Sequence, residues 1–427
     1  MGTKQFLQKR RKAISLGLLN RGGEMQAFWI YIFIDNEYVR CAKLTVTEEN
    51  FELEYEQSYL NLEKKIDIDP QNLPTDGRKF TSNELFSSLL DSAPDFWGQQ
   101  LLNKKFNVSE LNELEYVLAN GLEHVGALAF SSIRHSEPMQ LTKDGWKPHQ
   151  KNQVELNQII EQTELMIKDA DRSKLKELFE FGPTLGGGKP KVSISIAGKY
   201  YLAKYGTSLD SLPEQKIEYA TMKMARDIGL KVPDIKISEH SGRKVFMIER
   251  FDRCIIDSNL KRYHFISALS VCGWYVNWQR DWSYPVFCEF IRKAGKNERE
   301  IKEDLCELFK RVAFNIAVNN DDDHPRNHGL LYKDNKWRLA PLYDVFPKSS
   351  STGTFMLAMS LGDRYREASK RNLMSAIKYF ELEESNAEKI IDDINKFVSE
   401  KWKDYFREQS ISEDVIRMYE NAFSLKI

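Results

Sequence analysis

The stretch that decides the fold is Asn-Asn-Asp-Asp-Asp-His-Pro-Arg-Asn-His-Gly at residues 319–329, followed by Leu-Tyr-Asp-Val at residues 342–345. Between the two motifs, a turn at Asp334-Asn335 predicts a short β-hairpin. Upstream, apolar residues recur at the spacing of one helix face: Ile301, Leu305, Leu308, Val312, Ala313 and Ile316. We therefore expect a buried helix that breaks into an acidic loop, a place where functional side chains are often found.

The spacing within this loop indicates a specific chemistry. An aspartate followed five residues later by an asparagine is typical of the protein-kinase catalytic loop, where the aspartate accepts the substrate hydroxyl proton and the asparagine binds magnesium. Asp322 and Asn327 have this spacing, and Asp344 follows beyond the hairpin as a second metal-binding carboxylate. Phosphoryl transfer needs oxygen ligands for a hard cation and a carboxylate that orients the hydroxyl, and this set supplies both.

Two other interpretations of the acidic loop stay open at this point. The side chains of Asp321, Asp322, Asp323, His324 and His328 include types that bind transition metals, although adjacent aspartates face different ways and no further His-rich element completes a shell. The loop is alternatively a solvated acidic turn without a ligand.

A second group of residues lies upstream of the loop. Residues 182–191 form a glycine-rich stretch that contains Gly186, Gly187, Gly188, Lys189 and Lys191. Backbone amides of such a loop can approach phosphate oxygens closely, although a plain flexible turn explains the glycines equally well. Pro183 and Pro190 occupy positions that exclude a Walker A motif.

Lys204 lies on the second strand of a hairpin predicted after the glycine-rich stretch, and Glu218 follows at the start of a helix. Protein kinases place a phosphate-binding lysine and its glutamate partner in this order. Each residue alone is typical of an ordinary surface charge, so the order carries the argument. We expect Lys189, Lys191 and Lys204 to face phosphates.

Composition restricts the class of protein further. The 427 residues exceed the size of a single core, and 62 basic against 63 acidic residues give a net charge of −1, which disfavours direct DNA binding. The five cysteines, an odd number without a CxxC pair, argue against disulfides or a zinc site and fit a reducing cytoplasm. No run approaches the ~18 apolar residues of a membrane-spanning helix.

The chain is expected to have an α+β fold, a β-rich N-terminal module followed by a two-lobed protein-kinase-like fold with an all-helical C-terminal lobe apart from the one hairpin. The boundaries that the pattern predicts are a basic N-terminal segment at residues 1–24, the β-rich module at 25–145, the N-lobe at 146–255 and the helical lobe at 256–427. A helix is predicted over residues 154–181.

These residues resemble a known family, the HipA-type serine/threonine kinases of bacterial type II toxin–antitoxin modules. The resemblance runs from about residue 26 to the end, and four stretches carry most of it: residues 186–191, 249–253, 320–327 and 337–344. Residues 92–98, Ser-Ala-Pro-Asp-Phe-Trp-Gly, are similar to the N-terminal module of the family.

The resemblance implies a role for each matching residue. Asp322 would be the catalytic base, Asn327 and Asp344 would hold Mg²⁺, Lys204 would contact the ATP phosphates, and Glu249 and Phe251 would lie at the hinge near adenine. The family also carries a regulatory serine in front of the glycine loop, and Thr184 occupies that position here. A phosphate on Thr184 would be repelled by the ATP phosphates, although Ser193 or Ser195 are alternative sites.

The resemblance also implies partners. These are a helix-turn-helix antitoxin, through which DNA is contacted only indirectly, and a protein substrate with a Ser or Thr acceptor, such as an aminoacyl-tRNA synthetase. The alternatives are a catalytically idle module that binds ATP or the antitoxin and acts in repression, and a small-molecule kinase. The complete set of Asp322, Asn327, Asp344 and Lys204 argues against an idle module.

Overall fold

The computed structural model describes residues 26–47, 49–135, 137–142, 145–148, 155–167, 189–208, 210–257, 259–276, 279–349 and 355–423. The predicted basic segment at 1–24, the glycines at 186–188, Thr184 and the end of the helix predicted over 154–181 lie outside these residues. The chain divides into two units, residues 1–202 with 252–264 and residues 203–251 with 265–427.

The first unit is built on a five-stranded antiparallel sheet with the strand order β4-β3-β2-β1-β5. Its strands are β1 (Gln26–Ile34), β2 (Glu37–Val46), β3 (Phe51–Tyr55), β4 (Lys79–Ser82) and β5 (Leu128–Ser131). The hairpin between β1 and β2 turns at Asp35 and Asn36, both with a positive φ. Asp and Asn tolerate this left-handed conformation, which is typical of two-residue hairpins.

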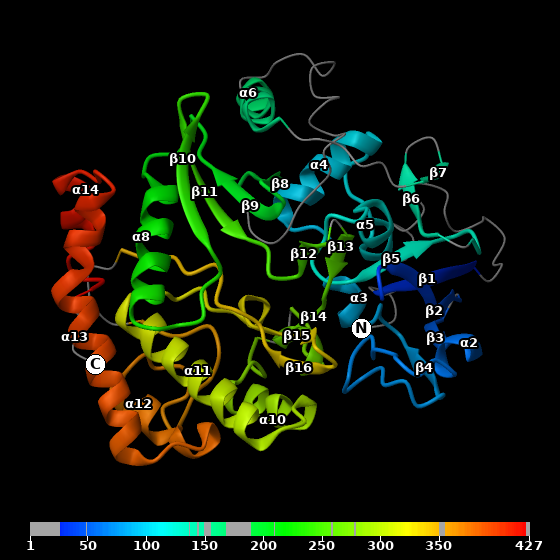
Figure 1. Cartoon of the computed structure of the whole chain (residues 1–427). Helices are drawn as coiled ribbons and strands as arrows, with labels where there is room; N and C mark the ends of the chain where they lie inside the picture. The colour runs from blue at the N-terminus through cyan, green and yellow to red at the C-terminus, as the bar shows by residue number, and fades with distance from the viewer. Residues whose placement is uncertain are drawn as a thin grey trace. The chain divides into compact units, whose positions relative to one another are not determined.

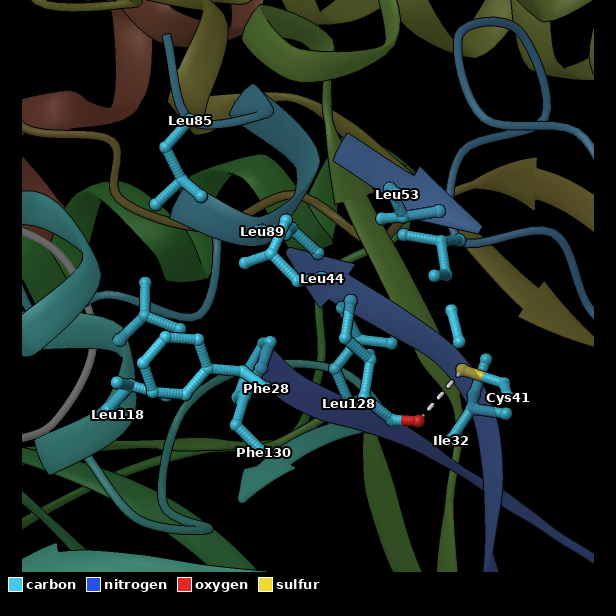
Figure 2. Close-up of a cluster of buried hydrophobic side chains, with 14 of the residues drawn as sticks. Phe28, Ile32, Cys41, Leu44, Leu53, Leu85, Leu89, Leu118, Leu128 and Phe130 are labelled. Atoms are coloured by element: carbon cyan, nitrogen blue, oxygen red, sulfur yellow. Dashed lines mark hydrogen bonds between the residues drawn. The ribbon is translucent and has the colours of Figure 1, made fainter. Parts of the chain in front are cut away.

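One face of this sheet packs against short helices. Figure 2 shows Phe28, Leu44 and Phe130 of the sheet gathered with Leu85, Leu89 and Leu118, and all six are buried. Cys41 belongs to the same cluster and donates a long hydrogen bond to the Ile30 carbonyl at 3.4 Å (Figure 2). The other elements of this unit are α2 (Gln57–Leu60), α3 (Ser87–Leu90), α4 (Phe96–Phe106), α5 (Glu113–Ala119), β6 (Met139–Thr142), β7 (Gly145–Pro148), α6 (Leu156–Ile167), β8 (Lys191–Ile196), β12 (Arg253–Ile256) and β13 (Asn259–Arg262).

A second sheet has the strand order β10-β11-β9-β8, and its strand β9 (Lys199–Tyr205) runs from the first unit into the second. The predicted hairpin is formed by β8 and β9, and it turns at Ala197 and Gly198. Helix α8 (Glu214–Asp227) follows, and Gly229, just after its C-cap, has a φ of 86°, the left-handed conformation that favours glycine after a helix. Strands β10 (Ile235–His240) and β11 (Arg243–Glu249) form the next hairpin.

The second unit is otherwise mainly helical. Figure 1 shows the long helix α13 (Glu384–Glu408) alongside α8 and α11 (Glu298–Ala317). The predicted apolar face of α11 is buried from Leu305 to Ile316, which confirms the periodicity. The remaining elements are β14 (His264–Ser267), α9 (Ala268–Val271), α10 (Tyr284–Ala294), η3 (Pro325–Asn327), β15 (Gly329–Lys333), β16 (Lys336–Leu339), α12 (Lys370–Ser375), η4 (Ile377–Phe380) and α14 (Glu413–Met418).

The α+β class and the β-rich N-terminal region are confirmed, and one detail of the prediction needs correction. Helix was expected throughout after residue 256 apart from the hairpin of β15 and β16, but strands β12 and β13 form a further hairpin and β14 joins β15 in a sheet. These strands have four residues each, and Ile255 and Ile256 are both exposed. Their sequence therefore lacks the alternation that identifies a half-buried strand.

All five cysteines lie in the described part of the chain, and the structure forms no disulfide among them. Burial raises the pKa of the Cys41 and Cys288 thiols well above the usual range, so neither is a nucleophile at neutral pH. Among the helices that the structure describes, none combines the length and the apolar character needed to cross a bilayer.

Candidate active site

The acidic loop begins where helix α11 ends at a left-handed asparagine. Asn319 has a φ of 56°, its amide donates to the Ile316 carbonyl, and the Asn320 amide donates to the Asn315 carbonyl at 2.9 Å. This pair of hydrogen bonds is the Schellman motif that ends many helices, with asparagine in the place of the usual glycine. The backbone therefore leaves the buried helix at a fixed angle and enters the loop directly.

Side-chain hydrogen bonds then hold the loop. The side-chain N–H of Asn315 donates to the Asp323 carboxylate at 3.1 Å, and the side-chain N–H of Asn320 donates to the Asn315 side-chain oxygen at the same distance. Asn327 closes the turn by donating its side-chain N–H to the Asp322 carbonyl at 2.8 Å. The amide oxygen of Asn327 is consequently the atom that remains for a cation, and it is a donor type that Mg²⁺ accepts.

The three adjacent aspartates have different surroundings. Asp323 is buried with 1% of its surface exposed, whereas Asp322 is exposed and Asp321 lies between them in exposure. Partial burial raises the pKa of the Asp322 carboxyl, His324 opposes this, and the nearby Asp344 and Asp321 carboxylates add to it. A carboxyl with a raised pKa that solvent can reach is suited to accepting a proton from a bound hydroxyl.

Lys204 brings two of the other predicted residues together. Its ammonium lies 2.5 Å from a carboxylate oxygen of Glu218 and 2.5 Å from a carboxylate oxygen of Asp344. The Lys204 and Glu218 side chains are each 11% exposed, and the Asp344 side chain is 37% exposed. Burial alone would lower the pKa of the Lys204 ammonium, but the Asp344 and Glu218 carboxylates raise it above its usual range, so the lysine is cationic.

The position of Asp344 is fixed by hydrogen bonds from the residues before it. The Leu342 amide donates to the Lys231 carbonyl at 2.8 Å, and the Tyr343 hydroxyl donates to the Arg326 carbonyl of the acidic loop at 2.7 Å. Asp344 itself has a φ of 59°, a conformation that few non-glycine residues adopt and that occurs often at functional sites.

Helix α11 also holds the residues that lead to Asp344 through its acidic side chains. The Asp304 carboxylate accepts hydrogen bonds from the Arg338 guanidinium at 2.7 and 2.9 Å and from the Leu339 amide at 3.0 Å. The Glu307 carboxylate accepts from the Lys231 amide at 3.0 Å. The C-terminal end of helix α11 therefore leads into the acidic loop, and side chains along the helix bind the residues that precede Asp344. Sequence reasoning missed these anchors, because each pairs residues that lie far apart in the chain.

Phe251, which the sequence placed near adenine, packs against this region. Its ring lies 5.5 Å from the Tyr343 ring and 5.6 Å from the Phe265 ring, centroid to centroid. Glu249, at the end of β11, donates its amide to the Asp234 carbonyl at 2.7 Å. The structure thus places the Phe251 ring against Tyr343, the residue before Asp344.

The predicted residues of the glycine-rich stretch are placed differently. Lys189 is exposed in the first unit, whereas the Lys191 ammonium lies 3.0 Å from the Asp95 carboxylate, and both of these side chains are only 2% exposed. Asp95 also caps helix α4 by accepting from the Gly98 amide at 2.8 Å. Lys191 is therefore enclosed by protein in a buried ion pair.

The transition-metal interpretation of the acidic loop receives no support. Within the part of the chain that the structure describes, no group of three or more His, Cys, Asp and Glu side chains is arranged to hold a metal ion. His328 is buried against the rings of Tyr284 and Phe287, and burial lowers the pKa of its imidazole to about 3. The oxygen atoms of Asn327 and Asp344 instead suit a Mg²⁺ ion whose remaining ligands are phosphate and water.

Two protein-family models match this chain. A family model described as the HipA-like C-terminal domain matches residues 183–402, and one described as the HipA N-terminal domain matches residues 31–131. The first match alone covers more than half of the chain. The chain therefore belongs to the HipA family.

Individual relatives are distant. A serine/threonine-protein kinase toxin HipA of Shewanella oneidensis is 24% identical over 306 residues, which cover 64% of this chain and 65% of the relative. A putative kinase of Haemophilus influenzae is 26% identical over 203 residues, which cover 42% of this chain and 58% of the relative. The matched regions thus span less than two thirds of either relative's length.

A solved structure of the Shewanella oneidensis HipA, in a complex with HipB and operator DNA, matches this chain with a TM-score of 0.64 and 17% identity. The match covers 94% of this chain and 96% of that one. At this level of identity the likeness concerns the fold, and it extends over both units.

Proposed function

We propose that this protein is a Mg-ATP-dependent serine/threonine protein kinase that acts as a growth-arresting toxin of a type II toxin–antitoxin system. The observation that carries the proposal is the contact of Lys204 with both Glu218 and Asp344, next to the loop that bears Asp322 and Asn327. Family membership supports the same activity. Strand, helix and loop each contribute one part of a phosphoryl-transfer site.

In this proposal each residue has one task. Lys204, held by Glu218, would contact the ATP phosphates, while Asp344 and Asn327 would hold Mg²⁺. When bound, this ion would supply positive charge that offsets the negative charge of the phosphates. Asp322 orients the acceptor hydroxyl and takes its proton, and Glu249 and Phe251 border the adenine.

The test uses purified protein with Mg²⁺ and ATP labelled on the γ-phosphate, alone and with a cell extract. We expect label on serine or threonine of the protein itself or of an extract protein, and a loss of about 10²–10⁴-fold for Asp322→Ala. Asp344→Ala is expected to be equally inactive, whereas Asp393→Ala, which removes an exposed aspartate of helix α13, serves as the matched control and keeps full activity. A wild type that labels nothing, with growth arrest that survives both active-site substitutions, would refute the kinase.

The proposed partner is a small helix-turn-helix antitoxin of the HipB kind, through which the complex contacts DNA. The support is the family and the composition of the solved relative, together with a net charge of −1 that provides no general attraction to DNA. An adjacent short gene for such a protein, and its co-purification with this chain, are the expected observations. Operator binding by this chain alone at physiological salt would contradict the proposal.

The proposed substrate is a translation-related protein such as an aminoacyl-tRNA synthetase, and the proposed switch is autophosphorylation of Thr184. We expect phosphate on Thr184 in active protein and none in the Asp322→Ala variant, and the same mass spectrum distinguishes the alternative sites Ser193 and Ser195. Thr184 unmodified in both proteins would remove the switch and leave the kinase proposal intact.

A further inference from the structure

A buried arginine lies in the C-terminal half of helix α11. Arg311 is 1% exposed, and its Nε donates to the Glu307 carboxylate at 3.0 Å. The same carboxylate oxygen accepts from the Lys231 amide, and the Lys231 carbonyl accepts from the Leu342 amide at 2.8 Å. Arg311 is therefore joined, through Glu307 and Lys231, to the residues that lead to Asp344.

The contact with Glu307 accounts for only one nitrogen of this guanidinium. The Nη2 atom of Arg311 is also buried, and none of the residues that the structure describes gives it a hydrogen-bond partner. An unpaired N–H in the interior costs free energy, because the same group would be hydrogen-bonded in water. Since a guanidinium is always charged and only donates, a further acceptor is expected at Nη2.

His328, which directly follows Asn327, has the same deficit. It is 1% exposed, and within the described part of the chain both of its ring nitrogens are buried without a partner. Its ring lies 5.6 Å from the ring of Tyr284 in helix α10, centroid to centroid, and the Tyr284 hydroxyl is a third such group. After burial, the charge of Arg311 is the largest cause of the lowered His328 pKa, so the arginine lies near this ring.

The hydrogen-bonding character of the three side chains suits a water molecule. A neutral imidazole has one nitrogen that donates and one that accepts, a tyrosine hydroxyl does both, and a guanidinium only donates. A water also donates and accepts, and a buried water typically makes about three hydrogen bonds to groups that are otherwise unpaired. An anion fits less well, because Glu307 already balances the charge of Arg311.

We propose that an internal water molecule, bound by Arg311 Nη2, a ring nitrogen of His328 and the Tyr284 hydroxyl, links the two sides of the proposed metal site. On one side, His328 is the neighbour of Asn327. On the other, the contacts of helix α11 connect Arg311 to the residues before Asp344. Arg311 and His328 are thus positioning residues, a role that rests on the proposed kinase activity.

The water site is tested by a high-resolution crystal structure of the full chain. We expect an ordered water within about 3.2 Å of Arg311 Nη2, the Tyr284 hydroxyl and one His328 ring nitrogen. His328→Phe keeps an aromatic ring and is expected to lose this water. Phe287→Leu changes the other ring that packs against His328, and as the matched control it is expected to keep the water. A direct hydrogen bond between Arg311 and His328 in wild type, or no water there, would overturn the proposal whether or not the protein is a kinase.

The positioning role is tested by the Mg²⁺ concentration that gives half of the maximal labelling rate at saturating ATP. We expect this concentration to rise about tenfold in His328→Phe, because Asn327 is held less firmly. His328→Gln keeps a donor and an acceptor and should return it to within about twofold of wild type.

Phe287→Leu alters packing without removing a polar group, so it should keep the wild-type value. An unchanged value in His328→Phe, or an equal rise in Phe287→Leu, would contradict the positioning role. A wild type that labels nothing would refute the kinase and this role together, with the water site still decided by the crystal structure.

Discussion

Two lysines of adjacent strands, Lys191 in β8 and Lys204 in β9, each form an ion pair, and they differ in what surrounds the pair. Lys191 and Asp95 are sealed, with 2% of each side chain exposed. Lys204 shares its charge between Glu218 and Asp344, and the Asp344 side chain remains 37% exposed. We call Lys191 and Asp95 the sealed pair, and Lys204, Glu218 and Asp344 the open group. A ligand cannot reach a pair that is closed to solvent, whereas a carboxylate that reaches solvent can exchange a lysine for a metal ion.

The comparison separates two uses of the same residue types. Removing one partner of a buried pair leaves an uncompensated charge, so the sealed pair acts on stability. The open group places a cation next to carboxylates, as phosphoryl transfer requires. We therefore expect substitutions in the two groups to change different measurements.

The largest expected effect is on activity at the open group. Lys204→Met should reduce labelling by about 10²–10³-fold, because the proposed function assigns to this cation the stabilisation of charge on the transferred phosphate. The substitution also removes the positive charge beside the buried Glu218 carboxylate, so the double variant Lys204→Met/Glu218→Gln should recover stability without recovering activity. Labelling by the double variant at more than about a tenth of the wild-type rate would contradict a role of the open group in activity.

The next effect concerns stability at the sealed pair. Lys191→Met should lower the free energy of unfolding by about 3–5 kcal/mol, because Asp95 remains buried and charged. Lys191→Met/Asp95→Asn should recover much of this loss, since asparagine still accepts from the Gly98 amide. Denaturant unfolding provides the measurement, and activity per folded molecule should stay near that of wild type. A stable but inactive Lys191→Met protein would show that Lys191 acts on phosphates after all.

The sequence predicted the open group better than the sealed one, for a physical reason. Asp322 and Asn327 lie in one loop, and Lys204 and Glu218 occupy a strand and the following helix, so local spacing records their proximity. Lys191 instead meets Asp95 from a distant part of the chain, and no local pattern distinguishes a sealed lysine from a phosphate-binding one. The anchors Asp304 and Glu307 were missed for the same reason.

Periodicity predicted α8, α11 and the hairpins of β8 with β9 and of β15 with β16, because each has one buried face. It failed for β12 and β13, whose short strands expose adjacent isoleucines. Asn319 is an intermediate case. An asparagine just after the last periodic residue is a recognised helix stop, so the start of the acidic loop was readable from the sequence.

The smallest expected effect is the pH dependence of folding in the first unit. Burial lowers the pKa of His264 to about 4, and its ring contacts the Ile68 carbonyl at 2.9 Å. Since the unfolded chain takes up this proton near pH 6.5, stability is lost as the pH falls from about 6.5 towards 4. Between pH 7 and pH 5 the contribution is about 2 kcal/mol.

The free energy of unfolding of wild type and of His264→Gln, measured at pH 7 and pH 5, isolates the contribution of His264. Glutamine keeps a donor for Ile68, and other groups, including Asp69, whose pKa burial raises to about 7, cancel in the difference. The variant should lose less stability in acid than wild type. Equal losses in the two proteins would show that His264 is not held neutral by its surroundings.

The most direct test of the central claim is a calorimetric titration of Mg-ATP into wild type, Lys204→Met/Glu218→Gln and Lys191→Met/Asp95→Asn. If the open group binds the nucleotide phosphates, the first double variant binds at least about tenfold more weakly than wild type and the second binds with wild-type affinity. Wild-type affinity in the Lys204 variant, or lost affinity in the Lys191 variant alone, would contradict the account.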